Sequence, residues 1–163
     1  MLGNKFATRL NSFSSKPEIF WRESSHSLSP SHLIERAGTV KGLTDLDLNF
    51  PDHAGNDLKK ILNSIKDNGL GINGFAMRYY TNPAFKLGAF TNPDKKVRQE
   101  AIDLTKKGID AARESNSNLM TIWLGQDGYD YGFQVDYKKI WQDEIDGIRE
   151  VALHDKDCEI SIE

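Results

Sequence analysis

The most chemically versatile side chains follow an apolar, strand-like run in the second half of the chain. Trp123 lies in the run 119–124, and Gln126 and Asp127 come shortly after it. An aromatic ring stacks on apolar C–H faces, while amide and carboxylate groups hydrogen-bond to hydroxyls, so this set suits a polyhydroxylated ligand. The alternative is structural: Trp123 packs in the core, and Asp127 and Gly128 form a turn.

A second candidate is His53, which is followed four residues later by Asp57. A carboxylate at this spacing can orient an imidazole for proton transfer, because histidine changes its charge close to neutral pH. The same spacing also fits the first turn of a helix, where Asp57 interacts favourably with the helix dipole. The sequence leaves both interpretations open.

Three polar side chains interrupt apolar runs: Arg9 and Asn11 near the N-terminus, and Arg78 after the run 72–77. Burying such groups is costly unless they are paired. They are therefore expected either to face a binding site, with Arg78 and Asn11 as substrate-binding residues, or to form salt bridges inside the fold.

Composition excludes several classes of protein. The chain has 163 residues with 38% hydrophobic and 28% charged residues, which fits one folded domain. A net charge of -3 argues against broad binding to nucleic acid, and no apolar run approaches the roughly 20 residues of a membrane span. Residues 1–5 lack the apolar stretch of a secretory signal, so we expect a cytoplasmic protein without nucleic-acid or membrane partners.

Apolar runs alternate with helix-length amphipathic segments. Strands are expected at 6–13, 43–48, 72–77, 119–124 and 158–162, and helices at about 30–40, 58–68, 92–112 and 136–153. The last helix is expected to bury Ile140, Trp141, Ile145, Ile148 and Ala152. This order predicts an α/β fold with a parallel sheet. The long aromatic loops follow strands, as at the active face of a (β/α)8 TIM barrel.

A complete barrel of this kind needs about 250 residues, so about five strands and four helices predict an incomplete one. Residues 1–163 are accordingly expected to form a single TIM-barrel domain that is truncated at its C-terminus.

Four segments carry a resemblance to a known family. They are 75–80 (Phe-Ala-Met-Arg-Tyr-Tyr), 90–93 (Phe-Thr-Asn-Pro), 123–131 (Trp-Leu-Gly-Gln-Asp-Gly-Tyr-Asp-Tyr) and 160–163 (Ile-Ser-Ile-Glu). Together they resemble the xylose isomerase-like TIM-barrel sugar isomerases and epimerases, of the rhamnose or sugar isomerase type. The segment 123–131 is the most specific of the four.

The resemblance implies a catalytic site at the carboxyl ends of the strands. Glu163 matches the position of a glutamate that binds the catalytic divalent metal, which would be Mn, Mg, Co or Zn. Carboxylates suit such cations, and a metal polarises a carbonyl and its neighbouring hydroxyl. The other ligands come from later strands that this chain lacks, so one carboxylate alone does not make a metal site. The alternative for Glu163 is a solvated terminal carboxylate.

The function that the resemblance implies is metal-dependent interconversion of an aldose and a ketose, with Glu163 and His53 as catalytic residues. Its partners would be a small-molecule sugar and, in the full-length form, further copies of itself in a homo-oligomer. Two alternatives remain. One is a ketose 3-epimerase of the same barrel family, and the other is a non-catalytic half-barrel that needs a partner chain. The truncated chain is expected to be inactive alone.

Overall fold

Five parallel strands form one sheet in which neighbours in sequence are also neighbours in space. The computed structural model describes residues 4–21 and 28–163. The strands follow the order β1-β2-β3-β4-β5, and each adjacent pair is parallel. Their bounds are Ala7–Arg9 (β1), Asp45–Phe50 (β2), Gly71–Met77 (β3), Leu119–Ile122 (β4) and Glu159–Ile162 (β5). The predicted α/β class and parallel sheet are confirmed.

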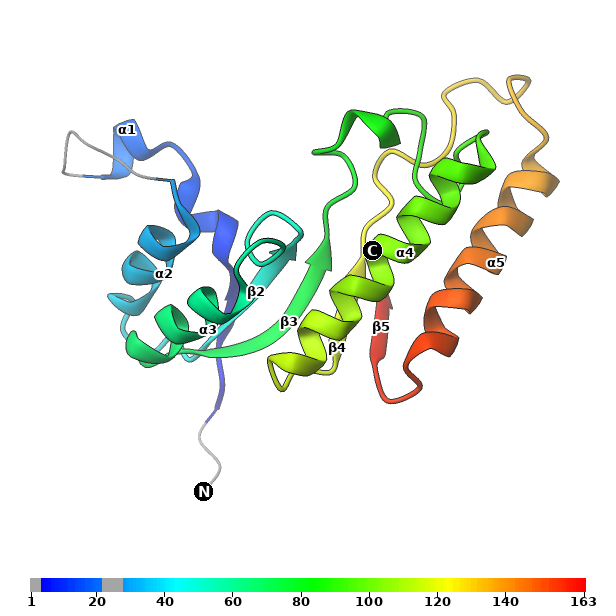
Figure 1. Ribbon diagram of the computed structural model, residues 1–163. Coiled ribbons are helices and arrows are strands. Elements are labelled where there is room, and N and C mark those ends of the chain that lie inside the picture. The colour runs from blue at the N-terminus through cyan, green and yellow to red at the C-terminus, as the bar shows by residue number, and fades with distance from the viewer. Residues whose placement is uncertain (1–3, 22–27) are drawn as a thin grey trace.

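The helices that connect the strands all lie on one face of the sheet (Figure 1). They are α2 (Pro30–Gly38), α3 (Leu58–Asp67), α4 (Lys95–Glu114) and α5 (Tyr137–His154). Each begins at a side chain that accepts a hydrogen bond from the first turn, namely Ser29, Asp57, Asp94 and Asp136. A short helix α1 (Pro17–Phe20) and two 3-10 turns, Leu10–Ser14 and Pro83–Phe85, complete the described elements.

The main hydrophobic core fills the space between this face of the sheet and the helices. Gly108 of α4 shows how closely the two layers approach. A Cβ at that position would lie 2.9 Å from Met77 Sδ and 3.0 Å from Met120 Cε. Met77 and Met120 therefore point toward α4. Because side chains alternate along a strand, the residues next to them face the opposite, helix-free side.

The helix-free side is concave. The guanidinium of Arg9, at the end of β1, forms an ion pair with the carboxylate of Glu163, just after β5. In a flat sheet these two edge strands would stand four spacings of about 4.8 Å apart, beyond the reach of both side chains. The ion pair therefore requires a sheet that is curled like part of a barrel wall.

Several expected boundaries are wrong. The first strand ends at Arg9 instead of residue 13, because the chain continues as the 3-10 turn Leu10–Ser14. The second strand is Asp45–Phe50 instead of 43–48. The third long helix begins at Lys95, because Asp94 and not Asn92 accepts the N–H of Lys96.

The buried face of α5 also differs from the expectation. Trp141 is 60% exposed and Ile145 is 44% exposed, whereas Gly147 and Val151 are buried. A Cβ on Gly147 would lie 3.1 Å from the ring of Phe90, so the missing side chain allows α5 to approach the core on this side. Ile148 packs against the core and Ile140 is half-buried, as expected, whereas Trp141, Ile145 and Ala152 are exposed. Among the described residues, no helix is long and apolar enough to cross a membrane.

Candidate functional site

Three of the predicted site residues lie side by side at the carboxyl edge of the sheet. Arg78 continues the ladder of β3 through its N–H, which donates to the carbonyl of Phe50 at 2.8 Å, and the N–H of Glu163 donates to Ile122 at 3.1 Å. Trp123 directly follows Ile122 at the end of β4. Alternation along the strands thus places Arg78, Trp123 and Glu163 on the concave side.

An aromatic wall surrounds the Arg78 guanidinium. The rings of Tyr80 and Trp123 meet edge to face with their centroids 5.1 Å apart. The Arg78 guanidinium carbon lies 5.2 Å from the Tyr80 centroid and 5.9 Å from the Trp123 centroid, and its Nη1 donates a hydrogen bond to the Tyr80 hydroxyl. Trp123 is half-buried. This wall combines ring faces and edges with a fixed cation, which suits a ligand that has both C–H faces and oxygens.

Gly125 is the position that holds Trp123 in place, and it gives the first prediction. A Cβ at residue 125 would fall 2.3 Å from the Trp123 ring, far inside van der Waals contact. Gly125→Ala is therefore expected to displace the indole and to shift its fluorescence emission by several nanometres. Gly132→Ala is the matched control, because a Cβ there meets nothing within 4 Å. Identical emission spectra for the two variants would contradict this packing.

Two asparagines, Asn49 on β2 and Asn11 in the 3-10 turn after β1, have a buried side-chain oxygen without a partner among the described residues. Asn49 pairs with Ala76 in the ladder between β2 and β3 and is 4% exposed. Its Oδ1 is buried and accepts no hydrogen bond within the described part of the chain, and the same holds for Oδ1 of Asn11. A buried acceptor without a partner costs free energy until a donor reaches it. Both amides are thus poised to accept hydrogen bonds from hydroxyls.

His53 lies in the loop after β2 and is held by the backbone. Its Nδ1 accepts a hydrogen bond from the N–H of Asn49 at 3.0 Å, so the proton of the neutral ring sits on Nε2. Burial is the main cause that lowers the pKa of His53 to about 4; Asp52 opposes the shift and Arg78 adds to it. At neutral pH the ring is therefore an uncharged hydrogen-bond donor.

Asp57 does not orient this ring. Its carboxylate caps α3 by accepting the N–H of Lys60 at 3.1 Å. Of the two interpretations that the sequence left open for Asp57, the helix start is the one that the structure contains.

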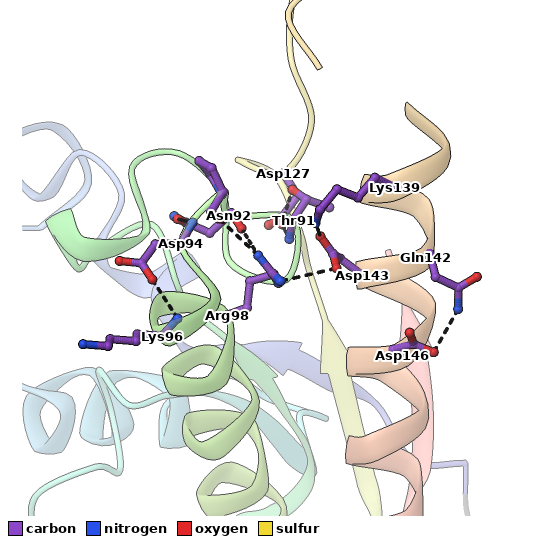
Figure 2. Close-up of polar contacts among 11 residues, drawn as sticks. Thr91, Asn92, Asp94, Lys96, Arg98, Asp127, Lys139, Gln142, Asp143 and Asp146 are labelled. Atoms are coloured by element: carbon purple, nitrogen blue, oxygen red, sulfur yellow. Dashed lines mark hydrogen bonds and ion pairs between the residues drawn. The ribbon is translucent and has the colours of Figure 1, made fainter. Parts of the chain in front are cut away.

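The carboxylate of Asp127 connects the loop after β4 to the loop after β3. It accepts the N–H groups of Ala89, at 2.9 Å and 3.0 Å, and of Thr91, at 2.6 Å, as well as the Thr91 hydroxyl at 2.7 Å. Figure 2 shows Asp127 and Thr91 beside the Arg98 network, in which Arg98 donates to the Asn92 carbonyl at 2.7 Å and pairs with Asp143 at 3.3 Å. These contacts give Asp127 a positioning role; its substrate-binding role stays a prediction.

The aromatic loop 79–91 is held by the hydrophobic core as well as by the hydrogen bonds of Asp127. Tyr79, Phe85 and Phe90 are buried, and Tyr79 contacts both phenyl rings with centroids 5.8 Å away. The Tyr79 hydroxyl lies 2.6 Å from Thr105 Oγ1, and burial raises the pKa of Tyr79 far above its ordinary value. Three of the four loop aromatics thus belong to the core, and only Tyr80 reaches the site.

Gln126 lies apart from this wall. It is exposed and lines a separate hollow of about 520 Å³ together with Lys86, Asp127, Tyr129 and Gln134. The Arg78 and Trp123 side chains do not line that hollow. The structure therefore brings Gln126 together with Asp127 but not with Arg78 or Trp123, and its substrate role stays a prediction.

The described residues do not make a metal site by themselves. No group of three or more His, Cys, Asp or Glu residues suited to a metal ion occurs within 4–21 and 28–163. The carboxylate of Glu163 is instead paired with Arg9. A divalent cation at this edge would need ligands from outside the described residues.

Sequence reasoning missed Asn49 and the role of Tyr80. A signal for Asn49 existed, because Asp45, Asp47 and Asn49 alternate with the apolar residues of β2. This alternation of polar and apolar residues is typical of a strand with one polar face. In a TIM barrel, ligands bind at the carboxyl ends of the strands, and Asn49 lies near that end of β2.

Known proteins were compared with this chain by sequence and by fold. No family model matches the chain. Over 84 residues, or 52% of the chain, it is 26% identical to the xylose isomerase of Thermus thermophilus, covering 22% of that protein. The solved D-psicose 3-epimerase of Clostridium cellulolyticum H10, in complex with D-tagatose, has a TM-score of 0.64 and 16% identity. A solved L-ribulose 3-epimerase has a TM-score of 0.65 and 18% identity.

Both structural matches include 98% of this chain, which spans 51% of the psicose epimerase and 48% of the ribulose epimerase. Identities this low show the fold and nothing finer. The five-stranded parallel sheet, its outer helices and these matches agree with the resemblance found in the sequence. The chain therefore has the fold of the xylose isomerase-like TIM barrels, and it spans about half the length of the solved barrels that it matches.

Proposed function

We propose that this chain carries the sugar-binding edge of a sugar isomerase or epimerase. The observation that supports this most directly is an aromatic wall at the same edge of the sheet as the unpartnered amide acceptor of Asn49. Tyr80 and Trp123 offer ring surfaces, and Asn49 and Asn11 offer buried acceptors. Sugars present C–H faces and hydroxyl donors, which match these two kinds of group.

Each residue of the proposed site has a separate role in the reaction. Neutral His53 donates through Nε2 to a carbonyl oxygen of the substrate, and Glu163 accepts a proton from the adjacent carbon once Arg9 releases its carboxylate. Arg78 and Trp123 orient the sugar. Any divalent metal would polarise the carbonyl with the help of ligands from elsewhere in the protein.

Two reaction types fit this arrangement. The similarity to a xylose isomerase favours exchange of an aldose and a ketose, and the similarity to two 3-epimerases favours inversion at the carbon next to the carbonyl. Proton abstraction in deuterium oxide replaces the abstracted hydrogen with deuterium, whereas a hydride shift between carbons does not. Proton NMR of D-fructose incubated with the protein distinguishes the two reactions by their products, because isomerisation gives an aldose and epimerisation gives the ketose inverted at C3.

Trp123 provides the binding test and the second prediction. Trp123→Ala is expected to weaken binding of D-fructose at least tenfold in calorimetric titrations, because it removes the ring on which the sugar stacks. Trp141→Ala is the matched control, since Trp141 lies on the outer side of α5 and is 60% exposed. The proposed function is wrong if D-fructose and the other simple sugars used below fail to bind, or if both tryptophan variants bind sugar equally well.

A further inference from the structure

Arg78 is a buried cation without a counter-charge among the described residues. It is 7% exposed, and its Nε is buried without a hydrogen-bond partner. Four other arginines pair with carboxylates: Arg9, Arg98, Arg113 and Arg149. No ion pair within 4–21 and 28–163 includes Arg78. A desolvated guanidinium normally requires such a partner.

The groups around Arg78 leave its charge uncompensated. Tyr80 and Trp123 contribute ring faces and one hydroxyl, which carry no net charge. His53 is neutral above a pKa of about 4, and Arg78 helps to hold it there. Asp52 is exposed and accepts a hydrogen bond from Thr81 at 3.1 Å. Glu163 is paired with Arg9, and the carboxylate of Asp127 accepts hydrogen bonds from Ala89 and Thr91.

The guanidinium has a donor that no group among the described residues satisfies. Nη1 is used by Tyr80, whereas Nε is unpartnered. A guanidinium offers its donors in a rigid planar fork that matches two oxygens of a carboxylate or a phosphate. The aromatic wall fixes the orientation of this fork next to the proposed sugar site.

From these observations we infer that Arg78 recognises an anionic group on the substrate, so that the preferred ligand is an acidic sugar bearing a carboxylate or a phosphate. This inference rests on the proposed function, because it assigns the substrate class of the same site. It departs from the neutral sugar named for the solved epimerase, D-tagatose.

The test compares three ligands that differ in one group: D-glucose, D-glucuronate and D-glucose 6-phosphate. Calorimetric titration is expected to give at least tenfold tighter binding for one of the two acids than for D-glucose. The acid that binds more tightly identifies the anion as a carboxylate or a phosphate. Raising sodium chloride from 20 mM to 500 mM should reduce this preference only slightly, because salt screens buried charges much less than exposed ones.

Variants assign the preference to Arg78. R78Q is expected to bind the acid and D-glucose within twofold of each other, and R78K should keep part of the preference because it retains a cation without the planar fork. R149Q is the matched control, since Arg149 is an exposed arginine paired with Asp146 on α5. Circular dichroism checks that each variant is folded, and the comparison of the three ligands on the unaltered chain can overturn the inference even if R78Q does not fold.

Each result decides between the two proposals. Equal affinities for the acids and D-glucose would overturn the inference about Arg78 and leave the proposed function standing. Absence of binding by every sugar would overturn both. Inorganic phosphate that binds as tightly as D-glucose 6-phosphate would also overturn the inference, because the site would then recognise a free anion.

Discussion

Asp127→Asn is expected to destabilise the protein by about 3 kcal/mol. The carboxylate accepts hydrogen bonds from the N–H groups of Ala89 and Thr91 and from the Thr91 hydroxyl, and an asparagine replaces one acceptor oxygen with a donor. Hydrogen bonds to a charged group each stabilise by roughly 1.5–3 kcal/mol, and the donors left without an acceptor add a desolvation cost. Urea unfolding followed by circular dichroism measures the loss.

Asp130→Asn is the matched control for this change. Asp130 follows three residues later in the same loop and is exposed, so removing its charge should alter the free energy of unfolding by less than about 0.5 kcal/mol. Because Asp127 fastens the loop that begins at Tyr79, Asp127→Asn should also weaken sugar binding at the neighbouring wall. Equal stabilities of the two variants would show that the Asp127 contacts do not hold the loops together.

The free energy of unfolding is expected to fall as the pH drops from 6.5 to 4, and His53 accounts for up to about 3 kcal/mol of this loss. The pKa of His53 is lowered from 6.5 to about 4 in the folded chain. Between these values the unfolded chain binds a proton that the folded chain does not, so acid favours unfolding. Above pH 6.5 both states are neutral at this residue and it contributes no pH dependence.

His53→Gln removes this titration and isolates its effect. Unfolding free energies measured in urea at pH 7, 5.5 and 4.5 should decline less steeply for His53→Gln than for the unaltered chain. His154→Gln, which changes an exposed histidine of α5, should preserve the original decline. If His53→Gln and the unaltered chain follow the same pH dependence, His53 is not shielded from water as the structure indicates.

The fold was largely predictable because its elements are local. Ser29 and Asp136 mark two helix starts in the sequence, and they cap α2 and α5 in the structure. The buried side of α5 was not predictable, since it depends on how closely Gly147 approaches Phe90 from another part of the chain. Sequence periodicity describes one helix at a time and contains no information about such an approach.

The candidate site was predictable in its residue types but not in its pairings. Arg78, Trp123 and Glu163 were recognisable as polar or aromatic groups at the ends of strands. Arg9 neutralises Glu163, whereas Arg78 has no such partner among the described residues. This difference depends on the curvature of the sheet, which no local pattern encodes. The hydrogen bonds of Asp127 were missed for the same reason, because their donors lie 36 and 38 residues away.

The order of the strands also bears on how the chain acquires its structure. Each strand pairs with the strand before it, so the sheet can grow by adding one βα unit at a time, and such local contacts favour rapid folding. The ion pair between Arg9 and Glu163 is different, because 154 residues separate its partners. It can form only after every strand between them is in place. The carboxylate of the proposed catalytic site is thus positioned only after these five strands have paired and the wall has taken its curvature.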